Sequence, residues 1–130
     1  MVIDTSALLA VVFDEPESER FAELIATSGT TLLSSVSWLE AGIVIEARKG
    51  RDAAGDYEAL LAAGRVKIVE FAPSQAAVAL DAWRRYGKGN HKAALNFGDC
   101  CAYALSKDSG QPLLFKGKDF SHTDVAAVPY

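Results

Sequence analysis

The sequence predicts an α/β domain of three layers, in which helices cover both faces of a mainly parallel sheet of four to five strands. Short apolar runs alternate along the chain with longer segments of helical periodicity, an order typical of parallel sheets. The apolar runs are nearly continuous, as in strands that are buried on both faces. The chain of 130 residues has the length of one such domain, and we expect residues 1–130 to form it.

The boundaries of the elements follow from apolar runs and from residues that start or stop helices. We expect strands at residues 1–3, 30–34, 66–71, 113–115 and 125–128. We expect helices at residues 7–13, 15–27, 39–48, 53–63, 73–86 and 97–109. Three polar residues are the predicted N-caps of the helices that follow them, namely Ser37, Asp52 and Asn96.

Two acidic residues follow predicted strands. Asp4 closes the apolar run 1–3, and Asp119 comes four residues after the run 113–115. An acid at the buried end of a strand is costly unless it is paired or binds a metal, and this favours a functional role for Asp4. Asp119 follows Gly117, so it also has an interpretation as an ordinary turn residue.

Two further acids lie at predicted helix starts. Glu40 and Asp99 each come three residues after a predicted N-cap, Ser37 and Asn96 respectively. This spacing places both carboxylates in the first turn of a helix. The same spacing is that of a capping box, which stabilises a helix end without any further function. Both interpretations stay open for Glu40 and for Asp99.

The predicted topology brings these four acids together. The carboxyl ends of parallel strands share one edge of the sheet, which is where open α/β folds bind their ligands. Carboxylates gathered at such an edge repel one another unless a cation neutralises them. Because carboxylate oxygens suit hard cations, the sequence predicts a site for Mg²⁺, or for Mn²⁺, formed by Asp4, Glu40, Asp99 and Asp119.

The net charge is −4, which is not that of a typical nucleic-acid-binding protein. The basic residues are nevertheless unevenly distributed. One strip of nine residues contains four cations and no acid, and it precedes the predicted helix that carries Asp99. Its basic side chains are candidates for binding a polyanion: Arg84, Arg85, Lys88 and Lys92.

Both cysteines lie next to each other in a predicted helix, where the side chains of Cys100 and Cys101 diverge by about 100°. A mutual disulfide is therefore not expected, and we interpret both residues as small core side chains in a reducing compartment. No apolar stretch reaches the ~20 residues of a membrane span. These observations predict a soluble, cytoplasmic protein without a membrane segment.

Four segments resemble the PIN-domain ribonucleases, in particular the VapC-like toxins of bacterial toxin–antitoxin pairs. None of these motifs is specific alone, but their order and spacing cover the whole chain. One departure is that Lys118 stands where relatives often carry another acid, which leaves Asp124 as an alternative to Asp119. The segments are Val2–Leu8, Val36–Glu40, Asn96–Asp99 and Leu113–Phe120.

The resemblance implies a divalent-metal-dependent endoribonuclease in which water attacks a phosphodiester bond and leaves a 5′-phosphate and a 3′-hydroxyl. It implies the quartet named above as metal ligands and a hydroxyl residue, here Ser6, beside the metal. Ser6 and Asn96 are also explained as simple helix caps, so their second role stays open. The sequence carries no visible code for which RNA is cut.

The resemblance also implies a small VapB-like antitoxin as partner. We expect it to insert one Arg or Lys side chain among the acids, because a basic group both neutralises them and excludes RNA. The helix that carries Glu40 is apolar all around its axis, which predicts that part of its surface is covered in a homodimer.

Other classes of protein fit less well. A phosphotransferase with Asp4 as its nucleophile would usually carry a second acid at the position of Ser6, and a receiver domain would carry an acid after its third strand, where Phe71 stands. A catalytically silent PIN-like module that binds RNA or protein stays open because of Lys118. Metal-dependent cleavage of RNA distinguishes the enzyme from this alternative.

Overall fold

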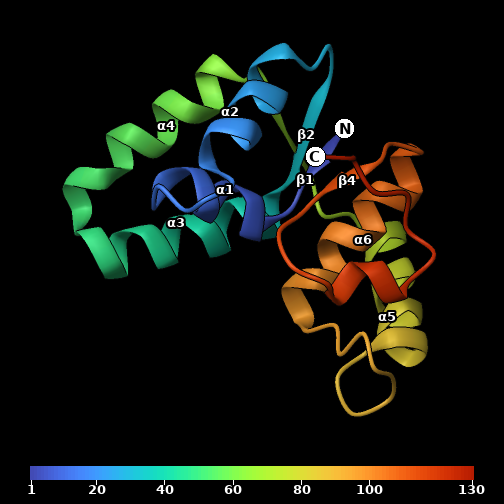
Figure 1. Ribbon diagram of the computed structural model, residues 1–130. Coiled ribbons are helices and arrows are strands. Elements are labelled where there is room, and N and C mark those ends of the chain that lie inside the picture. Colours follow the sequence, from blue (N-terminus) through green and yellow to red (C-terminus); the bar gives the residue numbers. More distant parts are fainter.

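The computed structural model describes residues 1–130 and contains one sheet of four parallel strands in the order β3-β2-β1-β4 (Figure 1). The strands are β1 Val2–Ile3, β2 Thr31–Ser34, β3 Val66–Val69 and β4 Leu113–Leu114. The α-helices are α1 Thr5–Val12, α2 Ser18–Thr27, α3 Ser35–Lys49, α4 Ala54–Ala63, α5 Pro73–Tyr86 and α6 Phe97–Ser109. Two 3₁₀-helices, η1 Arg51–Ala53 and η2 Asp119–His122, complete the fold.

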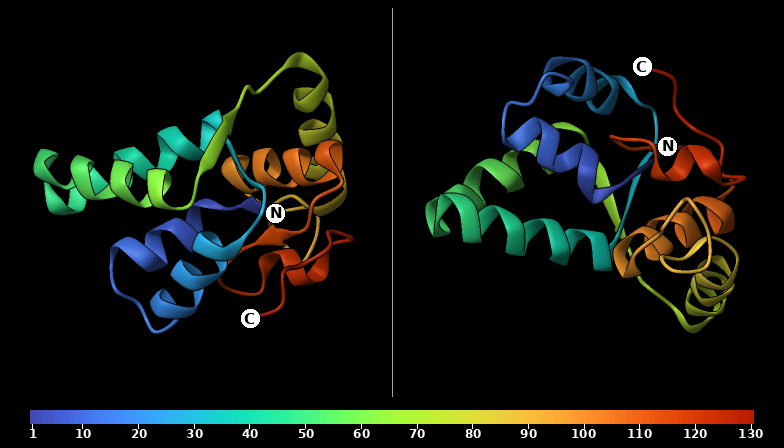
Figure 2. Two further views of the ribbon diagram at one scale, coloured as in Figure 1. Left: turned by 90° about the horizontal axis from the view of Figure 1, so that it is seen from above. Right: turned by 60° about the horizontal axis from the view of Figure 1, so that its bottom comes forward.

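The helices form layers on both faces of the sheet, which confirms the predicted fold class (Figures 1 and 2). Helices α1 to α4 share one apolar core with Ile3 and Leu114, whereas α5 and α6 share a second core with Val2 and Leu113. Neighbouring residues of β1 and β4 therefore serve opposite cores, as the two-residue period of a strand requires. None of the helices combines the length and the hydrophobicity that a membrane crossing requires.

The segments that carry the predicted acidic residues lie at one edge of this sheet. Only Asp4 separates the last residue of β1 from the first residue of α1, and α3 follows β2 without any loop. Since all strands are parallel, the starts of α1 and α3 lie at the same edge as the chain that leaves β4.

Several predicted boundaries are wrong. The N-cap of α3 is Ser34, whose Oγ accepts from the Val36 backbone N–H at 3.3 Å, while Ser37 is buried inside the first turn. The helix starts earlier than predicted because β2 runs directly into it, and Glu40 is therefore not part of a capping box. Asp52 lies in η1, and the residue before α4 is Ala53.

The predicted fifth strand at 125–128 is reduced to one parallel bridge between Leu113 and Ala127. The two-residue strand β4 is too short to hold a longer partner. Helix α2 begins only at Ser18, later than predicted, and the carboxylates of Glu15 and Glu17, which precede it, pair with Lys116.

Candidate active site

Asp4 is the most buried member of the acidic quartet, with 3% of its surface exposed. Its backbone N–H donates to the Leu114 carbonyl at 2.9 Å, which fixes its position beside the end of β4. Its Oδ2 accepts from the Ser6 backbone N–H at 2.9 Å and from the Ser6 hydroxyl at 2.6 Å. Burial raises the pKa of Asp4, the Ser6 hydrogen bonds oppose this shift, and the charge of Glu40 adds to it.

Ser6 has two partners at this edge. Its Oγ donates to Asp4 and accepts from the Lys116 backbone N–H at 3.0 Å, so one hydroxyl joins the start of α1 to the chain that leaves β4. The Asp4 side chain caps α1, while Ser6 lies in the first turn of this helix. The interpretation of Ser6 as a simple cap is therefore wrong, because its hydroxyl orients the Asp4 carboxylate.

The Lys116 side chain reaches in another direction, where its ammonium group pairs with Glu15 and with Glu17, the latter at 3.0 Å. All three side chains are about one-third exposed. This ion cluster ties the α1–α2 connection to the same segment that contacts Ser6. No local pattern predicts this cluster, since Lys116 and Glu15 lie about a hundred residues apart in the chain.

Glu40 lies against the start of α6. A Cβ atom added at Gly98 would come within 2.4 Å of Glu40 Oε2 and within 2.8 Å of Oε1. The absence of a side chain at Gly98 therefore lets the α3 carboxylate approach α6 closely. A glycine in the first turn of a predicted helix is the signal that could have indicated this contact.

Asp99 forms the predicted capping box with Asn96. The Asp99 backbone N–H donates to Asn96 Oδ1 at 2.9 Å, and the Asn96 backbone N–H donates to Asp99 Oδ2 at 3.0 Å. Burial raises the pKa of Asp99 to about 7, and the negative charges of Asp4, Asp119 and Glu40 contribute to this shift. The capping box and the acidic cluster are thus combined in one residue.

Asp119, at the start of η2, is exposed, and its charge acts on Asp99. Asp124 has other partners: its carboxylate accepts from the Tyr103 hydroxyl at 2.6 Å and pairs with Lys107 at 3.1 Å and with Arg85 at 3.5 Å. These contacts, with the Tyr103 hydrogen bond first, lower the pKa of Asp124 to about 2. Of the two candidates for the fourth acid, the geometry favours Asp119.

The donor set fits a hard divalent cation. The hydrogen bonds that Ser6 and Asn96 donate to Asp4 and Asp99 all end on Oδ2, so Oδ1 of each carboxylate lies outside them. No three acidic, His or Cys side chains converge at the spacing of a complete coordination shell. The acids are near enough to raise the pKa of Asp99 but are not closed around one point, as expected for carboxylates that repel one another.

The predicted basic strip divides into two parts. Arg85 donates to the Tyr86 hydroxyl at 2.8 Å and pairs with Asp124 and with Asp81, so it holds the C-terminal segment against α5. The other three cations are exposed and form no ion pair: Arg84, Lys88 and Lys92. Both cysteines are buried and free, as predicted.

Comparison with known proteins shows which family of proteins this chain resembles. Residues 1–126 match the PIN domain. The crystal structure of VapC20 from Mycobacterium tuberculosis, described as a sarcin–ricin loop cleaving toxin, has a TM-score of 0.79 at 18% identity and covers 99% of this chain and 98% of that chain. The structure of VapBC2 from Rickettsia felis, bound to a DNA fragment from their promoter, has a TM-score of 0.76 at 13% identity, with 98% and 96% covered.

A relative with higher sequence identity places the chain within one group of this family. Ribonuclease VapC30 of M. tuberculosis is 50% identical over 128 residues, which cover 98% of this chain and 98% of that protein. The chain therefore belongs to the PIN-domain family and, within it, to the VapC ribonucleases. The predicted class, a PIN-domain endoribonuclease of the toxin–antitoxin kind, is confirmed.

Proposed function

We propose that this chain cleaves RNA with a divalent cation, Mg²⁺ or Mn²⁺, held by Asp4, Glu40, Asp99 and Asp119. The observation that supports this proposal best is the pKa of Asp99, which burial and three neighbouring negative charges raise to about 7. A cation at the same place would remove that repulsion.

The residues have distinct tasks in this proposal. Asp4 and Asp99 hold the cation most directly, and Glu40 and Asp119 complete the set directly or through water. When bound, the cation lowers the pKa of the attacking water and neutralises charge on the scissile phosphate. Ser6 and Asn96 keep the Asp4 and Asp99 carboxylates oriented, and one of the four carboxylates accepts the proton of the water. The products carry a 5′-phosphate and a 3′-hydroxyl.

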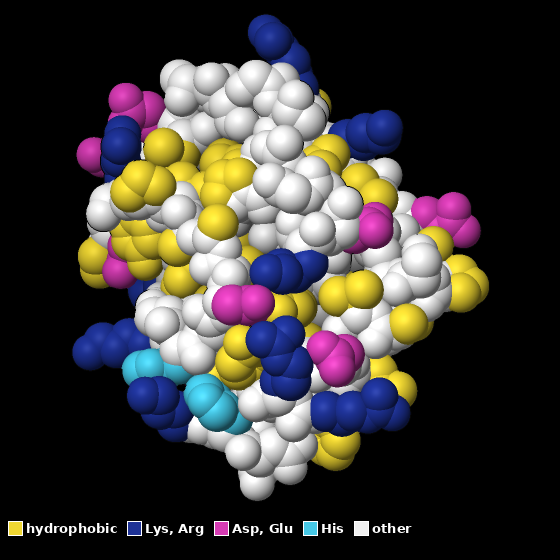
Figure 3. All heavy atoms as spheres, turned by 90° about the vertical axis from the view of Figure 1, so that its right-hand side faces the viewer, with side chains coloured by type: hydrophobic (Ala, Val, Ile, Leu, Met, Phe, Trp, Pro, Cys, Tyr) yellow, Lys and Arg dark blue, Asp and Glu magenta, His cyan; other side chains and the backbone are white.

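Exposed cations beside the site are proposed to bind the RNA backbone. The face formed by α5, α6 and the C-terminal segment carries Lys, Arg and His side chains, with Asp and Glu between some of them (Figure 3). Arg84, Lys88 and Lys92 are free to contact phosphates, whereas Arg85 pairs with Asp124 and Asp81. The free thiols and an RNA substrate fit the cytoplasm as the place of action.

The partner proposed for this toxin is a VapB-like antitoxin that inserts an Arg or Lys among the acids. The VapBC2 structure, whose fold is similar, is a complex of a toxin with its antitoxin. Helices α3 and α4 enclose a hollow of 230 Å³ with Trp38, Leu39 and Ile43 on its wall, which suits an apolar helix of the partner.

The exposed apolar side chains of α3 also support a homodimer. Leu39 and Ile43 are 55% and 59% exposed and lie one turn apart on α3. Adjacent exposed apolar side chains of this kind mark an interaction surface. A two-fold axis would cover the same patch on both copies. Sedimentation at micromolar concentration tests this, because a monomer would contradict the dimer.

The test of the proposed activity is RNA cleavage by Asp4→Asn and Asp99→Asn at saturating Mg²⁺. We expect both variants to fold and to lose cleavage. Cleavage by either variant would exclude that residue as a ligand. Wild-type protein that binds RNA but never cleaves it would instead support the silent binding module.

A further inference from the structure

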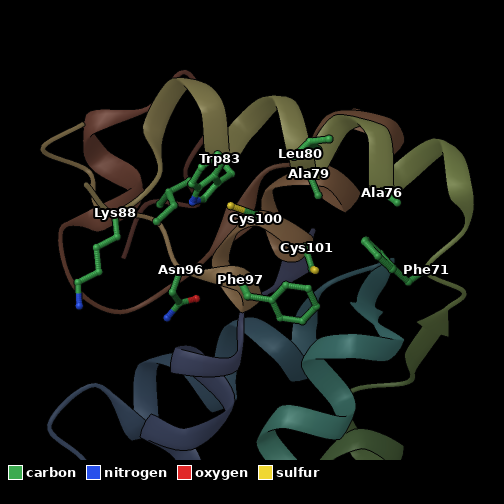
Figure 4. Close-up of a pocket in the computed structure, with 11 residues that line it drawn as sticks. Phe71, Ala76, Ala79, Leu80, Trp83, Lys88, Asn96, Phe97, Cys100 and Cys101 are labelled. Atoms are coloured by element: carbon green, nitrogen blue, oxygen red, sulfur yellow. The ribbon is translucent and has the colours of Figure 1, made fainter. Parts of the chain in front are cut away.

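A cavity of 410 Å³ lies between α5 and α6, beside the proposed active site (Figure 4). Its volume lies within the ~300–1,000 Å³ typical of small-molecule sites. Cys100 and Cys101 lie between its walls, and aromatic side chains stand on several sides of it. The aromatic members are Phe71, Trp83 and Phe97.

Trp83 is a fixed wall of this cavity although it is 46% exposed. A Cβ atom at Gly87 would come within 2.4 Å of the Trp83 ring, so the ring packs directly on the glycine backbone. The Trp83 carbonyl accepts from the Gly87 backbone N–H at 2.8 Å and from the Asn90 side chain at 3.2 Å. The indole face is therefore positioned before any ligand arrives.

Phe97 is the opposite wall and the most exposed large apolar side chain, at 73%. It is the first residue of α6, held between the members of the capping box that contains Asp99. Its ring projects across the mouth of the cavity toward Phe71 (Figure 4). An exposed aromatic ring thus lies two residues from a proposed metal ligand.

Polar groups stand only at the rim. Lys88 directs its ammonium group outward from the cavity, and Asn96 lies between Lys88 and Phe97 (Figure 4). The Asn96 carbonyl oxygen is occupied by the Asp99 backbone N–H, which leaves the amide nitrogen free to donate. Exposed Arg84 lies on the same helix as Trp83. The rim therefore suits an anionic ligand whose apolar ring enters the cavity.

We propose that this cavity binds one unstacked nucleobase of the RNA, next to the phosphodiester bond that is cleaved. The proposal rests on the proposed function. RNA is read largely at single-stranded loops, whose bases stack on aromatic side chains while cations hold the flanking phosphates. The juxtaposition of Trp83 and Phe97 with Lys88 and Asp99 matches this arrangement, and the RNA class that fits is a single strand with an unstacked base.

The binding test uses Trp83 as its own reporter. The only other tryptophan is Trp38, so Trp38→Phe in an Asp4→Asn background leaves Trp83 as the single tryptophan and no cleavage. The cleavage site is first mapped with the wild-type protein on total RNA, and the probe is a single-stranded RNA that contains this site. We expect it to quench Trp83, and Phe97→Ala, or an abasic nucleotide beside the cleaved bond, to weaken binding about 5- to 150-fold.

The cleavage test uses Phe97→Ala in the otherwise unchanged protein, with Ile68→Ala as matched control because Ile68 is an exposed apolar residue on β3, outside the cavity. We expect only Phe97→Ala to raise KM and to change which bonds are cut. Equal affinity and equal cleavage sites in both variants would overturn the base site while the ribonuclease assignment stands. Phe97 also lines a hollow with Leu39 and Ile43, the patch that the proposed dimer covers, so a weaker dimer in Phe97→Ala does not by itself concern the cavity. Wild-type protein in which Trp83 is already shielded from solvent without RNA would show that a second copy fills the cavity and would overturn the proposal.

Discussion

Ser6 donates its hydroxyl proton to Asp4 Oδ2 at 2.6 Å and accepts the Lys116 backbone N–H at 3.0 Å. This hydroxyl thereby joins the start of α1, which follows the central strand β1, to the chain that leaves the edge strand β4, at the most buried carboxylate. The hydrogen bond favours the ionised form of Asp4, the form that binds a cation.

Ser6→Ala should weaken Mg²⁺ binding by about 10- to 100-fold, the usual effect of removing a group that orients a ligand. The variant loses the hydroxyl donor, so the Asp4 carboxylate turns more freely and keeps its proton to higher pH. Calorimetric titration with Mg²⁺ measures the affinity without depending on cleavage. Ser6→Thr keeps the hydroxyl and should retain binding; equal affinity in Ser6→Ala would show that the hydrogen bond has no role.

Gly98→Ala should remove activity without unfolding the chain. The new Cβ atom occupies the place of the Glu40 carboxylate, which is the end of a flexible side chain and moves away at small cost. Alanine also favours a helix by up to ~1 kcal/mol over glycine. We expect lower Mg²⁺ affinity with an unchanged or slightly higher melting temperature. Normal affinity in Gly98→Ala would show that Glu40 does not need this position.

Gly110→Ala is the matched control for that substitution. Gly110 has φ +66° at the end of α6 and no atoms near its missing Cβ. Its replacement should lower stability through backbone strain and leave Mg²⁺ affinity unchanged. Gly98→Ala should therefore lower function without lowering stability, whereas Gly110→Ala at the C-cap of the same helix should lower stability without lowering Mg²⁺ affinity.

The stability of the metal-free protein should fall as pH rises from about 4 to about 7. The pKa of Asp99 is raised from 3.8 to about 7 in the folded chain, so the folded state holds more protons than the unfolded state in this interval. Asp99→Asn keeps an acceptor for the Asn96 N–H and removes the charge. We expect it to be more stable than wild type at pH 8, by ~1–2 kcal/mol after allowance for partial exposure.

Urea unfolding with chelator at pH 4 and pH 8 measures this effect. The two proteins should differ little at pH 4 and diverge at pH 8, where the wild-type carboxylate is ionised. A wild-type protein whose stability is constant across this range would contradict the raised pKa of Asp99 in the folded chain.

The layers of the fold, and the positions of the acids at strand ends and helix starts, could be predicted from the sequence because they depend on local patterns. Asp4 after an apolar run and Asp99 three residues after Asn96 are visible in single segments. The cap of α3 was assigned to Ser37 because nothing in the sequence shows that β2 runs into the helix at Ser34. The predicted strand at 125–128 is reduced to one bridge because its pairing depends on the length of β4.

Long-range contacts could not be predicted from the sequence. The ion pair between Lys116 and Glu15, the close approach of Glu40 to Gly98 and the separate role of Asp124 depend on how distant segments pack. Local rules describe a helix start or a strand, but they do not describe which side chains meet across the fold.

The most direct test of the metal site is a calorimetric Mg²⁺ titration at pH 7, repeated in two buffers of different ionisation enthalpy. Because burial raises the pKa of Asp99 to about 7 and also raises the pKa of Asp4, the folded site holds protons at this pH, and binding of the cation should release them. Asp99→Asn should bind more weakly and release fewer protons than the wild type. Absence of saturable Mg²⁺ binding, or binding that Asp4→Asn and Asp99→Asn leave unchanged, would contradict a cation held by these acids.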